Sequence, residues 1–476
     1  MPTDKEQLHG KVVSDRNINK DKGLYKNPIV MIKDNIVFTN KSVWAYYILA
    51  EKPYDFLSHQ SKYKLANSTI QALSAIARRG DQSVDCHLLI TTVPFNVENW
   101  ITQVEETYGS WQETRNEVSK RDPRVPPIDD TPFINYVNSV ADDLYTTDYR
   151  KRITLLGVKL FTRGAASFDS GLLDLGAKEM WGLLKGSIAN IFHVPDENIS
   201  NKEHEKATKA ENNLFQVLGV GDLRAVRPTA EEILMTVKQR YYPGLVTPYL
   251  EVDHDNRIGL NDIITETGGE IQVNPRTIRF NHLINGEEYN GYRSTVTITK
   301  FPKHMTIPSF TEPFFNKVHM LDYNCYARFI LVPTEEMKKK FQKKKLEADD
   351  ELKNLGESGQ RATTGIQETF DDLQTMENVM EGNNNPWVMG SYRITIDGQS
   401  EDEVNKAYSA LKQAYKEDDL EINLTSGDQL ALFREEQIGG EIEVKDFQHI
   451  TDLSILAASG FNHGGYVGDP IAKEGS

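Results

Sequence analysis

The chain has 476 residues, more than one hydrophobic core normally organises, so roughly two to four domains are expected. Its net charge of −16 argues against a general nucleic-acid-binding surface, because phosphate binding needs clustered Lys and Arg. Its two cysteines, Cys86 and Cys325, allow no disulfide framework or zinc motif, which indicates a reducing compartment. The polar N-terminus and the lack of any run of about 18 apolar residues predict neither a signal peptide nor a membrane span, so a cytoplasmic protein is expected.

The first 27 residues are polar and charged and predict a disordered arm. From Pro28 onward, two apolar runs around a Lys-Asp-Asn turn predict a hairpin, and Val43–Leu49 predicts an aromatic-rich strand. Ser58 is a good N-cap for a helix that runs to about Arg79. The elements expected next are the strand Val84–Val93, the helices Val97–Tyr108 and Phe133–Leu144, the strand Arg152–Phe161, the helix Leu173–Phe192 and a charged, helical or mobile segment over 200–213.

A capping-box pattern at Thr229 and Glu232 predicts a helix that ends at Gly244. The strands expected after it are Ile271–Phe280, Tyr289–Phe301 and Arg328–Val332. Thr334, followed by two glutamates, is expected to cap a long helix that forms the first arm of a helical hairpin. Residues 388–424 then predict a βαβ unit whose helix begins with a second capping box.

The order of these elements predicts an α+β fold of ferredoxin-like split βαβ sheets, in two related halves with an inserted helical hairpin. The expected organisation is a disordered arm (1–27), a first α+β subdomain (28–165), a mainly helical segment (166–270), the strand-rich part of a second α+β subdomain (271–333), the helical hairpin (334–385), a βαβ closing unit (386–460) and the start of a linker (461–476).

No nucleotide-binding motif is recognisable in the sequence. A P-loop needs GxxxxGK[ST], whose amides cradle phosphate while its Lys reaches the terminal oxygens, and no segment matches. The glycine-rich runs at 219–221 and 464–468 are not followed by the Lys-Ser/Thr pair, and neither HExxH nor GxSxG occurs. We therefore expect no catalytic residue, bound cofactor or metal ion in this chain.

Two small clusters of reactive side chains have alternative interpretations. Cys86 and His87 are adjacent on a predicted strand, so their side chains face opposite ways, and a core Cys beside a surface His is expected. Asp253, His254 and Asp255 resemble loose metal ligands, which a metal-dependent enzyme would use. A solvated loop is the preferred interpretation of this second cluster.

A basic patch lies on one predicted helix, with six lysines within eight residues: Lys338, Lys339, Lys340, Lys343, Lys344 and Lys345. Such a patch suits DNA or an anionic lipid surface. Four acidic residues follow within 347–351 and partly neutralise it. A solvated helix face is therefore preferred, and direct nucleic-acid binding is not expected.

The second half of the chain resembles a known family in an ordered series of elements and in a short motif. The residues that carry the motif are Gln429, Leu432, Phe433 and Gly439, followed by Gly465-Tyr466-Val467-Gly468. They are similar to the pattern Q-x-x-L-F-x-x-x-x-P-G and the later G-x-Y-I-G strand that end the N-terminal domain of conjugative type IV secretion ATPases of the VirB/TrbE class. Ile438 stands where Pro is usual, which predicts a looser loop.

The front half of the chain looks like members of this family from Gram-positive mobile elements. Val43–Tyr47, Tyr54–Ser58 and Arg227–Ile233 carry this likeness, which extends over about residues 28–470. In such proteins the nucleotide-binding motifs lie in a downstream motor domain, and this chain ends about where that domain opens. ATP and Mg²⁺ are expected only with the motor domain, and no catalytic residue can be carried over.

The resemblance implies an assembly and docking region that contacts other subunits of a secretion channel. It also implies packing in a homo-oligomeric ring and a place at the inner face of the cell membrane, reached through partners. The alternative is a DNA-binding accessory protein of a mobile element, which would use the patch Lys338–Lys345.

Overall fold

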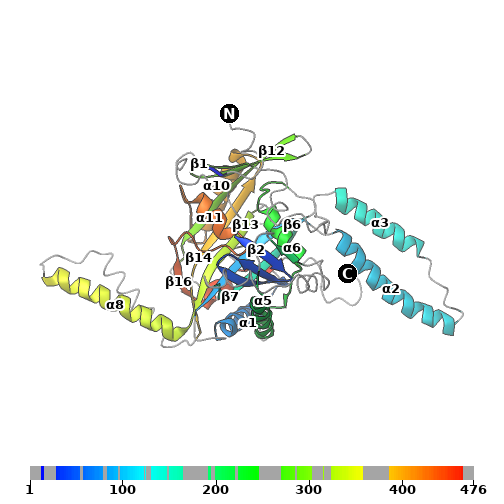
Figure 1. Cartoon of the computed structure of the whole chain (residues 1–476), viewed down its shortest axis with the longest axis horizontal. Helices are drawn as coiled ribbons and strands as arrows, with labels where there is room; N and C mark the ends of the chain where they lie inside the picture. Colours follow the sequence, from blue (N-terminus) through cyan, green and yellow to red (C-terminus); the bar gives the residue numbers. More distant parts are fainter. Residues whose placement is uncertain are drawn as a thin grey trace.

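The computed structural model shows a mixed α+β architecture, as predicted (Figure 1). The described residues form one sheet of 15 strands, antiparallel apart from one parallel pair at its end. A second, two-stranded sheet pairs β17 (His463–Gly464) with β5 (Lys52–Pro53). The described residues are 12–14, 28–53, 57–78, 83–94, 97–122, 124, 130–146, 150–163, 191–193, 199–219, 223–245, 270–284, 287–302, 315, 323–357, 385–461 and 463–464.

The large sheet has two sides that meet at the antiparallel pair β6 (Val84–Pro94) and β13 (Tyr323–Val332). Outward from β6 lie β7 (Arg150–Thr162), β4 (Ser42–Leu49), β3 (Ile36–Thr39), β2 (Ile29–Lys33) and β8 (Ile191–His193). Outward from β13 lie β14 (Trp387–Gly398), β12 (Glu287–Lys300), β11 (Ile278–Ile284), β10 (Glu270–Val273) and β1 (Val12–Ser14). Three short strands pair off this path: β9 (Ala225–Val226) on β4, β15 (Glu421–Leu424) on β12 and β16 (His449–Asp452) on β14.

The same connectivity occurs on both sides of the sheet. A three-stranded meander, β2–β3–β4 or β10–β11–β12, is followed along the chain by β6 or β13 and then by β7 or β14. The last strand lies between the meander and its predecessor in both cases. A helical arm leaves the sheet between β6 and β7, and another leaves between β13 and β14, so the two arms have equivalent places in the connectivity.

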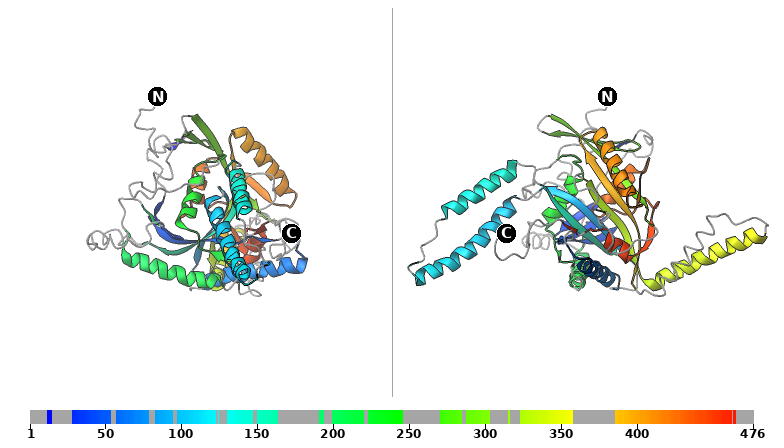
Figure 2. Two further views of the ribbon diagram at one scale, coloured as in Figure 1. Left: turned by 90° about the vertical axis from the view of Figure 1, so that its right-hand side faces the viewer. Right: turned by 180° about the vertical axis from the view of Figure 1, so that it is seen from behind.

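The first arm consists of α2 (Val97–Arg121) and α3 (Thr131–Thr146), and the described part of the second arm is α8 (Thr334–Glu357). The arms project from opposite ends of the molecule, as the front view and the view from behind both show (Figures 1 and 2). The sheet therefore separates two elongated helical surfaces.

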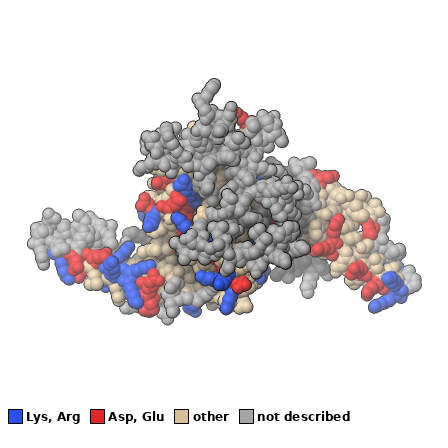
Figure 3. Space-filling model, in the orientation of Figure 1, with Lys and Arg blue, Asp and Glu red and all other residues tan. Residues whose placement is uncertain are grey.

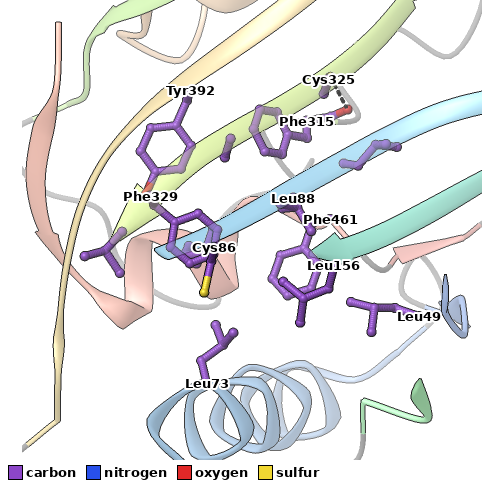
Figure 4. Close-up of a cluster of buried hydrophobic side chains, with 14 of the residues drawn as sticks. Leu49, Leu73, Cys86, Leu88, Leu156, Phe315, Cys325, Phe329, Tyr392 and Phe461 are labelled. Carbon is purple, nitrogen blue, oxygen red and sulfur yellow. Dashed lines mark hydrogen bonds between the residues drawn. The ribbon is translucent and has the colours of Figure 1, made fainter. Parts of the chain in front are cut away.

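One face of the sheet carries the largest apolar core. It is covered by α1 (His59–Ala77), α5 (Asn201–Leu218), α10 (Glu401–Lys416) and α12 (Leu453–Ala458), whose apolar stripes belong to that core. Figure 4 shows Leu73 of α1 below Cys86 of β6 and Leu156 of β7. Full burial of such an aliphatic side chain contributes roughly 1.5–3 kcal/mol. The opposite face is covered by α6 (Ala230–Gln239) and α11 (Gln429–Glu436).

The predicted helix starts are set by local hydrogen bonds. The Ser58 hydroxyl accepts a bond of 3.2 Å from the Ser61 amide at the start of α1. At α6, the Thr229 hydroxyl accepts from the Glu232 amide at 3.2 Å, and the Glu232 carboxylate accepts from the Thr229 amide at 2.8 Å. These bonds satisfy amide groups that have no partner within the helix.

Three predicted helix ends are wrong. The helix expected to end at Gly244 ends at Gln239, because the residue before Pro243 is disfavoured in a helix. The helix expected to end at Tyr108 continues to Arg121, because Gly109 costs only about 1 kcal/mol in a helix interior and is followed by good helix formers. The helix expected over 173–192 does not include its last residues, since Ile191–His193 is the strand β8, paired with β2. The β-branched and aromatic residues of β8 suit a strand.

Two further differences arise from specific bonds. The region expected to hold two strands over 271–301 holds three, because the Asn274 amide donates to the Thr277 carbonyl at 2.8 Å and closes a turn between β10 and β11. Thr334 lies within α8 rather than before it, and its hydroxyl donates to the Asn385 carbonyl at 2.8 Å. The hydroxyl therefore ties α8 to the start of β14 instead of capping the helix.

Several predictions fall on residues outside those described. They include the disordered arm apart from β1, the second arm of the predicted hairpin over 358–384, the cluster Asp253–Asp255 and the motif at 465–468. Among the described residues, no helix is both long and apolar enough to cross a membrane.

Candidate functional site: two arms on a cross-linked sheet

The sheet face beneath α6 and α11 is charged as well as buried. Four arginines lie there at 2% exposure or less: Arg240, Arg293, Arg328 and Arg393. Asp397 accepts two bonds from Arg293, at 2.7 and 2.8 Å, and Glu436 lies 3.2 Å from Arg240 and 3.4 Å from Arg293. Burial alone would lower the pKa of Arg293, but these two carboxylates raise it above its ordinary value. Arg293 therefore stays charged inside the protein.

The segment 429–444, here called the strap, consists of α11 and the loop that follows it across this face. Its first residue, Gln429, accepts a bond from the Thr295 amide at 2.8 Å and donates to the Thr295 carbonyl at 3.0 Å. The side-chain amide thus bonds to β12 as a neighbouring strand would. Farther along, Glu435 accepts bonds from the amides of Glu443 and Val444 and lies 3.6 Å from the buried Arg393.

The strap turns sharply after α11. The Gly440 amide donates to the Gln437 carbonyl at 2.8 Å, and Gly439 has a φ of +73°, so Ile438 occupies the turn position where Pro is favoured. The Gly439 amide donates to the Tyr46 hydroxyl at 2.8 Å. The structure therefore shows a hydrogen-bonded turn where the absence of Pro predicts a loose loop.

His87 is buried on the same face and is not the surface residue expected from the sequence. Its neighbour Cys86 faces the opposite core, as the alternation of a strand requires. The expectation failed because α6 and the strap cover the second face of the sheet. His87 Nδ1 lies 3.2 Å from the Tyr46 hydroxyl, and burial, then the charges of Arg328 and Arg240, hold the pKa of His87 well below 6.5.

The two cysteines of the sheet are buried and are disfavoured as thiolates. Cys86 and Cys325 are free thiols, and burial raises the pKa of Cys86 and brings that of Cys325 to about 12, so thiolate forms are disfavoured at neutral pH. No group of three or more His, Cys, Asp or Glu side chains among the described residues is arranged to hold a metal ion.

The predicted basic patch lies on α8, the second arm. Met337 and Phe341 anchor the base of this helix in a small core, with the Phe341 ring 6.0 Å from that of Trp387. Lysines gather along the first half of the arm, as the surface view shows (Figure 3). Three of the six lysines pair with carboxylates of the same helix: Lys338 with Glu335 at 3.4 Å, Lys340 with Glu336 at 2.8 Å and Lys343 with Glu347 at 3.9 Å.

The α2–α3 arm is a second candidate surface, which the sequence analysis missed. Tyr108 stacks on Phe133 with ring centroids 3.6 Å apart, and its hydroxyl bonds to Asp130 at 2.8 Å, so the two helices are joined near the middle of α2. Of the eight large apolar side chains that are exposed among the described residues, four are on this arm: Trp111, Val118, Ile134 and Tyr136. The signal in the sequence was the seven-residue spacing of Trp111 and Val118, which places both on one helix face.

Comparison with known proteins adds no family assignment. No protein-family model matches the sequence, and no curated protein sequence is significantly similar to it. The two arms and the sheet that carries them are therefore the features that bear on function.

Proposed function

We propose that the chain is an assembly and docking region of a conjugation-type secretion ATPase. It binds other subunits of the secretion channel and neighbouring copies of itself, and it reaches the inner face of the cell membrane through these partners. The observation that carries the proposal is the pair of helical arms, which leave equivalent places in the sheet and project from opposite ends (Figure 1). Exposed apolar side chains on a projecting arm are a mark of protein–protein contact.

The strap supports the family likeness because its motif residues have demanding structural positions. Gln429, Leu432 and Phe433 are fully buried, and Gly439 has a backbone conformation that favours glycine. The strap needs these residue types in order to pack on the face of the sheet that α6 and α11 cover. The motif on which the family likeness rests therefore has a structural reason in this chain.

The sheet supports the proposal that each side derives from a ferredoxin-like split βαβ unit. On the side of the sheet that contains β13, β14 and β15 both pair antiparallel with β12, and α10 joins them along the chain. Both strands pair with Val296 and Thr297 of β12. They are thus two parallel strands that flank a third strand, with a helical crossover between them. The matching connectivity of the two sides supports their origin as related halves, each with one inserted arm.

Catalysis is not part of the proposal for this chain. ATP and Mg²⁺ belong to the motor domain that the resemblance implies, and the present sequence contains no P-loop to bind them. Purified chain should therefore show no ATP hydrolysis above that of a preparation carrying Gln429→Ala, in which the strap is loosened. Turnover that follows the chain through successive columns and is lost in that variant would refute this part of the proposal.

Site-specific photo-crosslinking in the host cell tests the docking role. A photoreactive residue replaces Trp111, Tyr136 or Leu346 on the arms. The matched control carries it at Lys406, an exposed position on α10. We expect adducts with membrane-integral subunits and with the chain itself from the arm positions, identified by mass spectrometry. Equal adduct patterns from the arms and from position 406 would refute the proposal.

The alternative is DNA binding through α8. Lys339 and Lys344 are exposed there, which favours it, whereas the ion pairs of three other lysines within the same helix oppose it. A salt-dependent gel shift that Lys343→Ala and Lys344→Ala together weaken would support DNA binding. An unshifted duplex at low salt would exclude it.

A further inference from the structure

We infer that the α2–α3 arm of one copy docks on the basic first half of α8 of a second copy, so that the chain assembles head to tail. The inference rests on the proposed assembly function and names the surfaces that carry it. It is drawn from the opposite charge of the two arms, their shared apolar character and their positions at opposite ends of the molecule.

The α2–α3 arm is acidic and also carries exposed apolar side chains. Its two helices hold seven acidic and three basic residues, a net charge of −4. Glu106, Glu113 and Glu117 are exposed at spacings of seven and four, so they form one stripe along α2. Trp111 and Val118 form a separate exposed stripe, roughly 120–140° around the helix from these glutamates, and Trp111 is 51% exposed. The arm therefore offers a row of carboxylates on one face and an exposed apolar pair on another, both available to a basic helix that carries an apolar side chain.

The first half of α8 has the complementary character. Its six lysines lie within eight residues, and Leu346, which follows them directly, is 65% exposed. Helical spacing places Lys339, Lys343 and Leu346 on the side away from the anchors Met337 and Phe341. This surface therefore offers lysines beside one leucine, and its charge is opposite to that of the glutamate stripe on the other arm.

The positions of the arms determine the kind of assembly. Because the two surfaces differ and lie at opposite ends of the chain (Figures 1 and 2), each copy has one surface of each kind available. Such a heterologous contact leads to a ring when the rotation closes and to a filament when it does not. A two-fold dimer through one self-complementary patch is not the form that these surfaces favour.

A second copy explains both arms at once, whereas nucleic acid explains only α8. A phosphate backbone would be repelled by the acidic arm and by the net charge of −16. The exposed Trp111 and Leu346 have no use in a purely electrostatic contact with phosphates. The charge and the apolar groups together therefore favour another protein surface of this chain.

The test is a charge exchange between two full-length variants, followed by sedimentation velocity. The acid-reversed variant carries Glu106→Lys, Glu113→Lys and Glu117→Lys, and the base-reversed variant carries Lys339→Glu and Lys343→Glu. We expect wild-type chain to associate with rising concentration, each variant alone to raise the dissociation constant at least about tenfold, and an equimolar mixture of the two to associate again. Trp111→Ala should also weaken association. Mixing this variant with the base-reversed variant should not restore association.

Matched controls reverse exposed charges elsewhere on the molecule. Glu205→Lys with Glu417→Lys, and Lys406→Glu with Lys412→Glu, should leave association unchanged, and circular dichroism should confirm folding of every variant. Wild-type chain that stays monomeric, or variants that associate like wild type, would overturn the inference. Loss of duplex binding in the base-reversed variant with association intact would overturn it too and assign α8 to nucleic acid. Crosslinks from the arms to channel subunits would still stand in each of these cases, so the proposed function fails or survives separately.

Discussion

The substitution Gly439→Ala tests how the strap is held on the face of the sheet that α6 and α11 cover. Gly439 has a φ of +73°, in the left-handed region that favours glycine. A Cβ added there would lie 2.5 Å from Cγ2 of Thr39 on β3, closer than real Cβ contacts come. The alanine variant therefore meets two separate penalties, one in its own backbone and one across the contact with β3.

The two penalties can be estimated separately. The left-handed conformation costs a non-glycine residue about 1–2 kcal/mol. Overpacking against a buried neighbour costs about 1–3 kcal/mol. Gly439→Ala should therefore lower the free energy of unfolding by about 2–5 kcal/mol. Thr39→Ser removes the methyl group while keeping the hydroxyl that accepts from the Ser42 amide at 2.9 Å. In the double variant, the overpacking part should be recovered and the backbone part should remain.

Denaturant-induced unfolding, followed by far-ultraviolet circular dichroism, measures these differences as shifts of the midpoint. Gly427→Ala is the matched control, since Gly427 has a φ of +98° and no atom lies within 4 Å of the added Cβ. It should show the backbone penalty alone. The reasoning is refuted if Gly439→Ala costs no more than Gly427→Ala, or if Thr39→Ser recovers nothing.

Three further predictions concern buried groups and one concerns the arm. Glu436→Gln removes the negative charge that two buried guanidinium groups share and should cost about 3–5 kcal/mol in the same unfolding assay. Gln429→Ala removes the side-chain bonds to the main chain of β12 and should cost about 1–3 kcal/mol; an unchanged midpoint would contradict the role given to it. The pKa of His87 is lowered in the folded state, so the unfolded state binds more protons below about pH 6.5 and stability falls as pH falls. His87→Phe should reduce this dependence of the unfolding free energy on pH by up to about 1.4 kcal/mol per pH unit. Unfolding midpoints measured from pH 7 to 5 test this. Trp111→Ala should change the unfolding free energy by less than about 0.5 kcal/mol, because the side chain is half exposed, and a larger loss would place it in a core.

Features set by neighbouring residues were predictable from the sequence. The caps at Ser58 and Thr229 need only a hydroxyl and an amide three residues apart, and both form as expected. The strand Val43–Leu49 follows from its own aromatic and β-branched residues and is β4 in the structure. The mixed α+β class follows from the order of such elements.

Features set by distant residues were not predictable. His87 is buried because the strap, some 350 residues later, crosses its side of the sheet, and no pattern around His87 reports that. Arg328 and Arg393 alternate with apolar or aromatic residues, as in a half-exposed strand, although both are buried in the structure. Trp111 and Val118 were missed because their helix was expected to end at Tyr108.

The buried charges and the projecting arms serve one arrangement. Buried ion pairs are weak evidence for net stability, because desolvation offsets much of their attraction. They are selective, however. Glu435 pairs with Arg393, whereas the next residue, Glu436, pairs with Arg240 and Arg293. A strap shifted by one residue would therefore leave buried charges unpaired. Fixing the strap fixes β12 and β14, β14 pairs with β13, and β13 leads directly into α8. A head-to-tail assembly multiplies any error in the angle between its two contact surfaces from copy to copy. A sheet whose buried charges disfavour a shifted strap, even at some expense in stability, is therefore the frame that the proposed docking of the two arms requires.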